Sequence, residues 1–507
     1  MKHALPVTRE QDFAAWYQAV ISEADLAEES GVRGCMVIRP WGYGIWERIQ
    51  KRMDARIKDA GVENCYFPLF IPLSFFEKEA DHVDGFAKEM AVVTHHRLKG
   101  IDGKLVPDPD SKLEEPLVVR PTSETVIGQA MSRWVQSWRD LPMRVNQWAN
   151  VVRWEMRTRM FLRTSEFLWQ EGHTAHADEQ DARHETMRAL EMYRDFAENE
   201  LAMPVVTGEK PENERFPGAV ATYSIEAMMQ DGKALQAGTS HYLGTGFAEA
   251  AGIRYQDKEG GQQLCHTASW GTSTRMIGGV IMVHGDDDGL RCPPQIAPHQ
   301  VVIVPMLRDA PEDEAVLAYC EELAGAVKAL DAFREPVRVL FDKRPGKAAN
   351  KRWAWVKKGA PVIVEVGGRD VAGGNVSVLR RDRLYNEGGK LASAILPKAD
   401  FIGSVAATLV EIQASLHGEA KARLEANIRR DVTEIGALAA AFDGDRPGWV
   451  EVEWARPTGA ALDKVVEWLK EHKLTLRNAP LDAAAAIGPC VFTGEKAVER
   501  VMVGRSY

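Results

Sequence analysis

The chain has 507 residues, too many for a single hydrophobic core, so its length predicts about three domains. It is 45% hydrophobic and 27% charged, and no apolar run approaches the roughly 18 to 20 residues of a membrane span, so we expect a globular protein without membrane association. The net charge of −10 argues against a surface that coats nucleic acid in general.

The start of the chain and its cysteines indicate a cytoplasmic protein. The first residues, MKHALPVTREQDF, have no apolar segment behind the basic residues, as a secretory signal would. The cysteines are scattered without a close pair, which fits a reducing compartment and excludes a C-x-x-C type of zinc site. They are Cys35, Cys65, Cys265, Cys292, Cys320 and Cys490.

Hydrophobic periodicity and turn residues predict the elements of the first part of the chain. We expect a helix over residues 8–30, a short strand over 36–39, a helix over 44–58 with an apolar stripe, and a loop-rich region to about Leu113. Leu117 then begins a strand that leads into a helix whose first turn holds Thr122, Ser123 and Glu124. Two strands follow between Asn146 and His176, joined by a turn at 157–163, then a helix over 179–201 and a strand over 204–207. A glycine-rich passage from Cys265 leads from a strand into a helix.

After a linker at residues 293–298 the pattern changes. Strand-like runs occur at 300–304, 337–341, 362–366 and 376–379, and helical patterns fill the gaps between the first three. This alternation predicts a small α/β domain with a mixed sheet. A long amphipathic helix is expected from Asp400 to about Phe442, followed by a third unit that ends at Tyr507.

The segment E166-F-L-W-Q-E-G-H-T-A-H176 is the first candidate for function. In a strand, Phe167, Trp169, Glu171 and His173 would project from one face, and Leu168, Gln170 and Thr174 from the other. A face that is aromatic, acidic and imidazole-bearing suits neither a core nor solvent, so it predicts the wall of a pocket for a small cationic or polar ligand.

Two other interpretations of this segment stay open. The spacing His173-x-x-His176 resembles that of a metal site, although residues three apart in a strand lie on opposite faces and cannot bind one metal ion together. Alternatively, the two histidines have only a structural role.

Arginines cluster near the same segment. Arg153 and Glu155 are two apart and so share a strand face, where the guanidinium can hold a phosphate or carboxylate, although an Arg–Glu pair is the simpler reading. The turn R157-T-R-M-F-L-R163 could surround a polyphosphate or be solvated loop charge. In W270-G-T-S-T-R-M-I-G-G-V280 small residues allow a backbone to approach a ligand, and Arg275 stands where a helix begins. G-x-x-x-x-G-K-[ST] is absent from the sequence, so any nucleotide is held by arginines instead.

A basic segment lies in the second part of the chain. Residues 334–383 contain 13 Lys or Arg against 5 Asp or Glu, and include K343-R-P-G-K-A-A-N-K-R-W-A-W355. Basic residues interleaved with tryptophan suit a polyanion with exposed bases, with a solvated basic face as the alternative.

Taken together, these segments resemble the prolyl-tRNA synthetase family, in the form shared by archaea, eukaryotes and some bacteria. R39-P-W-G-Y-G-I-W-E-R is similar to motif 1 of class II synthetases. Q147-W-A-N-V-V-R-W-E155 through F161-L-R-T-S-E-F-L-W-Q-E-G-H-T-A-H is similar to motif 2, and G271-T-S-T-R-M-I-G-G-V-I-M-V-H-G to motif 3. R120-P-T-S-E-T125 and Q236-A-G-T-S-H241 resemble prolyl enzymes in particular, and the similarity extends from about Phe13 to Tyr507.

The resemblance implies a proline–tRNA ligase reaction in two steps. The carboxylate of L-proline attacks the α-phosphate of ATP, and a ribose hydroxyl of tRNA(Pro) then attacks prolyl-adenylate, so that AMP and pyrophosphate are released. Mg²⁺ is expected to bridge the phosphates and neutralise the leaving pyrophosphate. No general base is needed for activation, because the carboxylate is already ionised.

Carried over position by position, the resemblance implies a role for each candidate residue. The proline site would comprise Thr122, Glu124, Arg153, Trp169, Glu171, His173, Phe216 and His241. The ATP site would comprise Arg153, Glu155, Arg163, Phe167, Gln236, Thr239, Ser273 and Arg275. Arg153 would bridge the carboxylate and the α-phosphate and Arg275 would clamp the γ-phosphate, so these two carry the catalytic role.

The implied fold is α+β, with an antiparallel class II catalytic domain over residues 1–292, an α/β anticodon-binding domain over 298–396, and a small α/β domain over 400–507. Arg344, Lys347, Glu365 and Arg369 lie in the segment where the family reads the anticodon. Motif 1 forms the dimer interface in this class, so the resemblance also implies a homodimer.

The sequence departs from the family in two places. Ser165 in L162-R-T-S-E-F167 replaces an arginine that family members often have, which puts adenylate contacts from that position in doubt. The C-terminal domain often binds zinc through four cysteines, of which Cys490 alone remains, with Thr493 where a C-x-x-C would close. One thiolate cannot make a structural zinc site, so we expect a metal-free domain.

The spacing between motifs 2 and 3 is too short for the editing insertion of the bacterial form. Rejecting alanine by binding alone is difficult, because a missing methylene costs only about 1–3 kcal/mol. Hydrolysis of mischarged tRNA would therefore need a separate protein. Two other functions stay open: another class IIa synthetase, or an inactive RNA-binding paralogue. The paralogue would have lost Arg153, Arg275 or Glu124, and all three are present.

Overall fold

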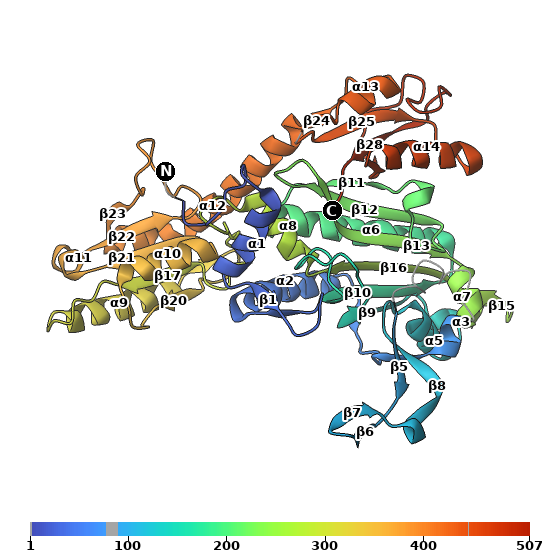
Figure 1. Cartoon of the computed structure of the whole chain (residues 1–507), viewed down its shortest axis with the longest axis horizontal. Coiled ribbons are helices and arrows are strands. Elements are labelled where there is room, and N and C mark those ends of the chain that lie inside the picture. The colour runs from blue at the N-terminus through green and yellow to red at the C-terminus, as the bar shows by residue number, and fades with distance from the viewer. Residues whose placement is uncertain (1–2, 78–89, 445) are drawn as a thin grey trace.

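The structure is a computed structural model that describes residues 3–77, 90–444 and 446–507. Its three largest sheets have eight, five and four strands, and helices pack on each of them (Figure 1). Separate helices and mainly antiparallel strands make this an α+β fold, as the sequence predicted.

The eight-stranded sheet has the strand order β27-β11-β12-β13-β16-β10-β9-β3. The strands, in that order, are Ala479–Pro480, Val206–Glu209, Ala221–Met228, Ala234–Gly244, His266–Ser273, Glu166–His176, Met143–Val152 and Glu63–Asn64. All neighbours are antiparallel except β3 and β9. The predicted strand pair around the 157–163 turn is therefore β9 and β10, and β10 lies between β9 and β16 near the middle of the sheet.

Helices cover this sheet where apolar residues repeat every three or four positions. In α2 (Pro40–Asp59) the predicted stripe of Ile45, Ile49, Met53 and Ile57 is buried. α6 (Glu179–Asn199) begins at Asp178, whose carboxylate accepts a hydrogen bond from the Asp181 backbone. α8 (Arg275–His284) follows directly after β16 and is buried over most of its length.

The helix predicted over residues 8–30 is too long. α1 covers Phe13–Glu23, and Asp25 has a positive φ of 55°, which interrupts the helix. β1 (Ala27–Glu29) then pairs with β2 (Met36–Ile38). Residues 27–29, which were predicted to be helical, therefore form a strand.

The region predicted as loop up to Leu113 contains regular structure, although its residues 78–89 lie outside the described ones. β4 (Phe70–Pro72), β5 (Ala91–His95) and β8 (Lys112–Val119) form one sheet, and β6 (Leu98–Ile101) and β7 (Lys104–Pro107) form a hairpin. α3 (Leu73–Glu77) follows β4. β6 and β7 are short and almost entirely solvent-exposed, so they lack the alternation that marks a half-buried strand.

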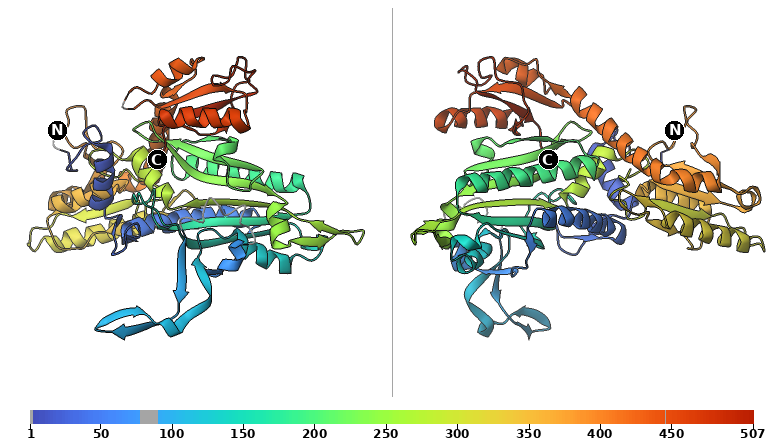
Figure 2. Two further views of the ribbon diagram at one scale, coloured as in Figure 1. Left: turned by 45° about the vertical axis from the view of Figure 1, so that its right-hand side comes forward. Right: turned by 180° about the vertical axis from the view of Figure 1, so that it is seen from behind.

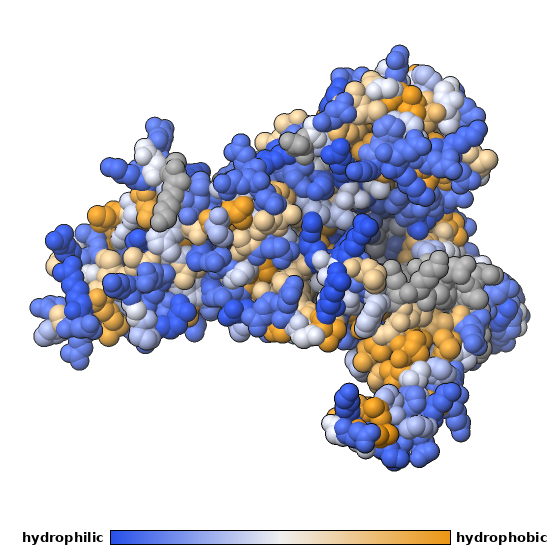
Figure 3. Space-filling view, in the orientation of Figure 1, coloured by the Kyte–Doolittle hydropathy of each residue, from blue (hydrophilic) through white to orange (hydrophobic). Residues whose placement is uncertain are grey.

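The ribbon of β5 to β8 projects from the body and carries apolar surface (Figures 1 and 3). Val92, Leu98, Ile101 and Leu105 are between 47% and 74% exposed there. β8 leads back to α5 (Glu124–Trp134), as the sequence predicted. α7 (Gly246–Ala251), β14 (Arg254–Gln256) and β15 (Gln262–Leu264) complete this part of the chain.

The five-stranded sheet has the order β20-β17-β21-β22-β23. The strands β17 (Val301–Pro305), β20 (Val339–Phe341) and β21 (Val362–Val366) are parallel, whereas β22 (Asn375–Arg380) and β23 (Ala394–Pro397) are antiparallel. The helices of this unit are α9 (Asp313–Lys328), α10 (Ala348–Lys358) and α11 (Gly368–Gly373). The predicted mixed sheet is confirmed, and the small ribbon β18 (Asp331–Ala332) and β19 (Glu335–Pro336) was not foreseen.

α12 (Lys398–Ala426) runs between the five-stranded and four-stranded sheets (Figure 2). The prediction that it continues to Phe442 is wrong, because β24 (Ile428–Arg429) and α13 (Ile435–Ala440) follow it. Among the described helices, α12 alone is long and apolar enough to cross a membrane, although the sequence predicted no membrane span. Phe401, Val405 and Leu409 pack in the core of the five-stranded sheet, a packing typical of an internal helix.

The four-stranded sheet forms the core of the C-terminal unit, in the order β24-β25-β28-β26. It contains β25 (Trp449–Trp454), β28 (Glu499–Gly504) and β26 (Thr475–Leu476), with α14 (Gly459–Glu471) beside them. The chain then leaves this unit, because β27 adds to the edge of the eight-stranded sheet. The C-terminal unit is thus joined to the first sheet by backbone hydrogen bonds.

Candidate functional site

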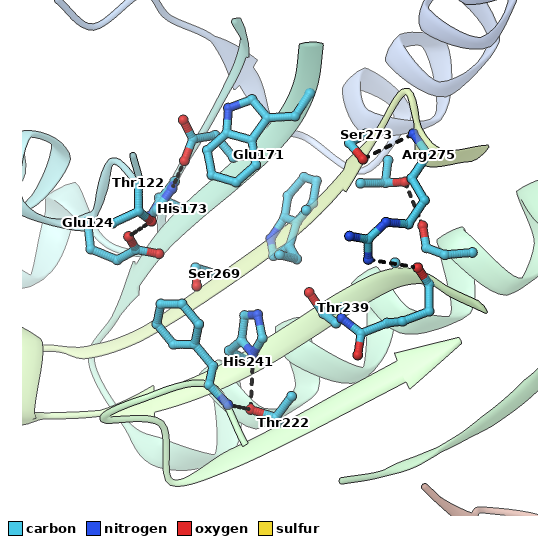
Figure 4. A pocket seen from close by; sticks show the side chains of 18 of the residues that line it. Thr122, Glu124, Glu171, His173, Thr222, Thr239, His241, Ser269, Ser273 and Arg275 are labelled. Atoms are coloured by element: carbon cyan, nitrogen blue, oxygen red, sulfur yellow. Dashed lines mark hydrogen bonds and ion pairs between the residues drawn. The ribbon is translucent and has the colours of Figure 1, made fainter. Parts of the chain in front are cut away.

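A pocket opens over the middle strands of the eight-stranded sheet (Figure 4). β10, β13 and β16 supply most of its walls. Of the residues that the sequence analysis assigned to proline or ATP, the pocket is lined by Thr122, Glu124, Arg153, Phe167, Trp169, Glu171, His173, Phe216, Gln236, Thr239, His241, Ser273 and Arg275. Residues up to 153 positions apart in the chain therefore meet at one place.

β10 has the predicted arrangement of side chains. Phe167, Trp169, Glu171 and His173 all line the pocket. On the other face, Gln170 donates to Asn146 Oδ1 at 2.7 Å and accepts from the Tyr193 hydroxyl at 2.6 Å. The alternation of a strand thus separates the pocket face from a hydrogen-bonded inner face.

The two histidines of this strand have different partners. His173 Nε2 lies 2.9 Å from Glu171 Oε2, within the pocket. His176 Nδ1 lies 2.6 Å from Asp181 Oδ2, and its Nε2 lies 2.9 Å from the hydroxyl of Thr174, which was predicted to lie on the opposite face from His173. Because each imidazole binds a different carboxylate, the arrangement gives no support to a shared metal site.

Glu171 is held from two further sides at the acidic end of the pocket. Its Oε1 accepts hydrogen bonds from Ser123 Oγ at 2.6 Å and from Gln147 Nε2 at 2.5 Å. Thr122 and Glu124 from the start of α5 are hydrogen-bonded to each other beside it. Burial works against protonation of His173, but the hydrogen bond and charge of Glu171 outweigh it and raise the pKa of His173.

His241 has the opposite electrostatic environment. Burial, together with the charge of His173, lowers the pKa of His241 to about 3, so the ring is neutral at physiological pH. Its Nδ1 lies 3.0 Å from Thr222 Oγ1, and its ring centroid lies 4.7 Å from that of Phe216. His173 is therefore protonated more readily than an ordinary histidine, and His241 less readily.

Two arginines define the cationic end. The Arg153 guanidinium lies over the rings of Phe167 and Trp169, 5.7 and 5.6 Å from their centroids, and its Nε donates to Pro121 O at 2.9 Å. Arg275 begins α8, and its Nε donates to Leu162 O at 3.2 Å. Burial, with the charges of Arg153 and Arg163, lowers the pKa of Arg275 to about 10, which still leaves it protonated.

Glu155 and Arg163 lie beside the pocket instead of lining it. β9 ends at Val152, so the expectation that Arg153 and Glu155 share a strand face is wrong. Glu155 Oε1 accepts from the Arg157 backbone at 2.7 Å. Arg163 lines a neighbouring basic pocket with Arg33, Arg157, Thr158, Arg159, Leu162, Lys233, Ser506 and Tyr507.

Several lining residues were given no individual role in the sequence analysis. They are Glu214, Arg215, Thr222, Ala237, Gly238, Ser269, Trp270, Gly271 and Thr272. Most flank predicted residues on β13 and β16, so a strand alternation applied to those segments would have found some of them. Among the described residues, Trp169 Nε1 and Ser269 Oγ are buried without a hydrogen-bond partner, which indicates that a polar ligand belongs here.

The serine of motif 2 is buried and hydrogen-bonded. Ser165 is 3% exposed, its backbone N–H donates to Gly34 O at 2.7 Å, and its Oγ accepts from the Glu155 backbone at 3.3 Å. Even one carbon added at Gly34 would collide with the Ser165 side chain. The Ser165 side chain is therefore packed closely against Gly34 and Thr158.

A second candidate site lies at the carboxyl ends of the parallel strands β20 and β21. Arg344, Lys347 and Arg369 are exposed there, and the buried Glu365 pairs with Arg352 at 3.0 Å. The tryptophans of the basic segment are not exposed for stacking: Trp355 is 4% exposed and donates from Nε1 to Asp342 at 2.9 Å, and Trp353 packs against the core. This face therefore offers positive charge beyond the strand ends, and neither tryptophan of the basic segment is fully exposed.

Comparisons with known proteins match the parts of the chain that contain the two candidate sites. Residues 108–284 match the tRNA synthetase class II core domain (G, H, P, S and T), and residues 300–395 match an anticodon binding domain. The chain is 78% identical to the proline–tRNA ligase of Sphingopyxis alaskensis, over 100% of this chain and 96% of that protein. It is 70% identical to the proline–tRNA ligase of Sphingomonas elodea, over 100% of each. A crystal structure of prolyl-tRNA synthetase from Cryptosporidium parvum, complexed with L-proline and AMP, is similar with a TM-score of 0.88 and 34% identity, over 99% of this chain and 97% of that one.

Proposed function

This chain belongs to the family of proline–tRNA ligases with a class II synthetase core, and we propose that it joins L-proline to tRNA(Pro) in two steps through prolyl-adenylate. ATP is consumed, and AMP and pyrophosphate are released. The observation that carries this proposal is one pocket with a carboxylate and aromatic rings at one end and two arginines at the other.

The acidic end suits the proline ring and its imino group. A protonated imino group is a compact cation, and Glu124, Thr122 and Glu171 offer oxygen acceptors to it. Trp169, Phe216, His173 and His241 close around the ring. The neutral imidazole of His241 adds no second positive charge beside the imino group.

The cationic end suits the groups that react. Arg153 lies between the aromatic wall and the ATP side of the pocket, where it can bind the proline carboxylate and the α-phosphate together. Arg275 at the start of α8 and Ser273 at the end of β16 hold the γ-phosphate. Phe167, Gln236 and Thr239 bind the nucleoside, and Glu155 and Arg163 add contacts from the motif 2 loop. Since the carboxylate is already ionised, placement and charge stabilisation provide the rate acceleration.

Mg²⁺ fits this site as a partner of ATP. In the described part of the chain no cluster of His, Cys, Asp and Glu could hold a metal ion by itself, and Mg²⁺ commonly binds largely through substrate phosphates and water. When bound, it would neutralise the leaving pyrophosphate. The chain's own contribution at that place is the positive charge of Arg153 and Arg275.

The three large sheets support a division into three domains, although β27 of the C-terminal part joins the eight-stranded sheet. We assign residues 1–292 to catalysis, 298–396 to anticodon binding and 400–507 to a C-terminal domain. Arg344, Lys347 and Arg369 would contact anticodon phosphates or bases, and Glu365, fixed by Arg352, would accept a hydrogen bond from a base. Contacts at the carboxyl ends of parallel strands are the general pattern for α/β sheets.

The C-terminal domain is proposed to fold without zinc. Cys490 is 2% exposed and packs in an apolar cluster with Trp454. The ring centroid of Trp454 lies 5.7 Å from that of Phe492. Hydrophobic packing takes the place that metal ligation has in relatives with four cysteines. One zinc per chain in a metal analysis of the purified protein would contradict this.

Three further properties complete the proposal. The chain has the archaeal and eukaryotic-like form, without an editing domain in cis. Its similarity to the Cryptosporidium enzyme over 99% of this chain supports this. Alanyl-tRNA(Pro) would then need a separate protein for hydrolysis. We propose a cytoplasmic homodimer, in which a second copy covers Val37 of β2 and Tyr43 of motif 1, which are 47% and 43% exposed. A monomer in analytical ultracentrifugation would contradict the dimer.

Exchange of pyrophosphate into ATP, run with each of the twenty amino acids, tests the main proposal. Exchange should depend on L-proline, occur more weakly with alanine or cysteine, and be abolished by Arg153→Ala. Arg133→Ala, an exposed arginine on α5, is the matched control and should exchange normally. Exchange with a different amino acid would move the chain to another specificity, and silence from a folded protein that binds tRNA would indicate an inactive paralogue.

A further inference from the structure

The C-terminal domain contributes a buried arginine to the eight-stranded sheet. Arg477 lies between β26 and β27, and β27 pairs with β11 through Gly208 and Glu209. The arginine is 6% exposed. Its Nη2 and Nε lie 2.7 and 3.2 Å from Oε2 of Glu226 on β12, so a charge pair crosses from one domain into the other.

Glu226 is the centre of a fully buried charge cluster. Its other oxygen, Oε1, lies 2.8 Å from Nζ of Lys210, which is 2% exposed, and accepts a hydrogen bond from Ser224 Oγ at 3.1 Å. Burial alone would raise the pKa of Glu226, but Arg477 and Lys210 outweigh it and lower the pKa to about 2. The carboxylate is therefore ionised and held from both sides.

This cluster is connected to the nucleotide end of the pocket. Glu226 is paired across β12 and β13 with Gln236, next to a bulge in the strand pairing. The carbonyl oxygen of Gln236 accepts from Arg275 Nη1 at 3.5 Å, and both residues line the pocket. The Glu226 charge also favours the protonated form of Arg275, against burial and the repulsion of Arg153, Arg163 and Arg477 itself.

We propose that Arg477 is a positioning residue for ATP: by fixing the Glu226 carboxylate it holds Gln236 and Arg275 in place, so that the C-terminal domain completes the nucleotide end of the site. Arg477 does not line the pocket and acts through Glu226. The inference rests on the proposed function of the pocket, because that function identifies its cationic end as the ATP side.

The test measures ATP and L-proline affinity separately, by calorimetry on the full chain. Arg477→Met should weaken ATP binding about tenfold, the size of a typical coupling between contacting residues, and leave L-proline binding within about twofold. Arg477→Lys keeps a charge at this position and should recover most of the loss. Should the methionine variant unfold, Glu226→Gln asks the same question through the other partner.

Arg456→Met is the matched control at the same domain interface. Arg456 also crosses to the catalytic sheet, with Nη2 3.2 Å from Glu209 Oε2, but its side chain is 47% exposed and far less dependent on its partner. This variant should bind ATP as the unchanged chain does. A loss of ATP affinity here as large as in Arg477→Met would assign the effect to domain docking in general.

A double-mutant cycle decides whether Arg477 works through Glu226. In a Glu226→Gln background the further change Arg477→Met should have a much smaller effect on ATP affinity. The proposal is overturned by unchanged ATP affinity in Arg477→Met or Glu226→Gln, by equal losses for ATP and proline, or by an undiminished effect in the double variant. Failure of the proposed function would show differently, as absent proline-dependent exchange in the unchanged chain.

Discussion

Glu171 and His173 form the acid and imidazole pair of the pocket, and other residues decide their orientation. Ser123 and Gln147 occupy one oxygen of Glu171, which leaves the other for His173. Gly172 between them is required by packing, since a side-chain carbon there would overlap the Trp270 ring. The pair is therefore fixed before any ligand arrives, which lowers the cost of ordering the site on binding.

Glu171→Gln should lower the pKa of His173. Since Glu171 raises that pKa against burial, the folded pKa exceeds the ordinary value, and the pair stabilises the fold fully below about pH 6.5. This contribution is lost as the pH rises through the folded pKa. In the variant, the stability difference between pH 6 and pH 8 should shrink, as measured by urea unfolding.

NMR titration of the histidine ring separates this from a general loss of stability. The His176 resonance is the internal control, because Asp181 is its partner and the variant leaves that pair in place. An unchanged His173 titration in Glu171→Gln would show that the carboxylate does not set the protonation of the imidazole.

At the scale of elements, strand order and helix ends place the functional groups. β10 brings its pocket face between β9 and β16, so motifs far apart in the chain become neighbours. α8 begins with Arg275 at the pocket and ends at His284. Asp286 just beyond that end forms an ion pair with Arg381 at 2.5 Å, and Arg381 is 2% exposed. The helix thus connects the pocket with the second sheet.

Arg381→Met should destabilise the protein by about 3–5 kcal/mol, because it leaves the Asp286 carboxylate without its buried partner. Urea unfolding at neutral pH measures this. Arg429→Met is the control: Arg429 pairs with Asp431 at an exposed position, where the pair contributes less than about 1 kcal/mol. Equal losses in both variants would mean that burial of the Arg381 pair has no special importance.

For the whole molecule, the separation of the two candidate sites on different sheets predicts separable activities. The double variant Lys347→Ala, Arg369→Ala should bind tRNA(Pro) more weakly, because about one to two phosphate contacts are lost. For the same reason its affinity for tRNA(Pro) should fall less steeply as the salt concentration rises. Proline-dependent pyrophosphate exchange should be unchanged, because neither residue lies near the pocket.

Filter binding at several salt concentrations measures the first effect. Lys328→Ala, which removes one exposed lysine in the last turn of α9, is the control for loss of positive charge elsewhere on this domain and should bind tRNA normally. A parallel loss of exchange activity in the double variant would contradict independent sites and indicate that the two sheets are coupled.

Much of the molecule could be predicted from local patterns. The β10 alternation, the α2 stripe and the mixed second sheet depend on periodicity within a few residues, which a sequence displays directly. The predictions that failed depend on competition between elements: residues 27–29 pair with β2 instead of extending α1, and the exposed ribbon strands have no apolar alternation to detect. The burial of Trp355 likewise depends on the other elements of the fold that pack against it.

The sequence by itself determined the residue types of the pocket, because acid, imidazole, aromatic and arginine side chains in fixed local spacing already specify what ligand chemistry they suit. Only the tertiary structure decided which partners hold them. The contacts of Glu171 with Gln147, of Arg275 with Gln236, and of Arg477 with Glu226 join residues 24 to 251 positions apart. Such pairs arise from strand order and domain docking, and no periodicity along the chain encodes the distance between them.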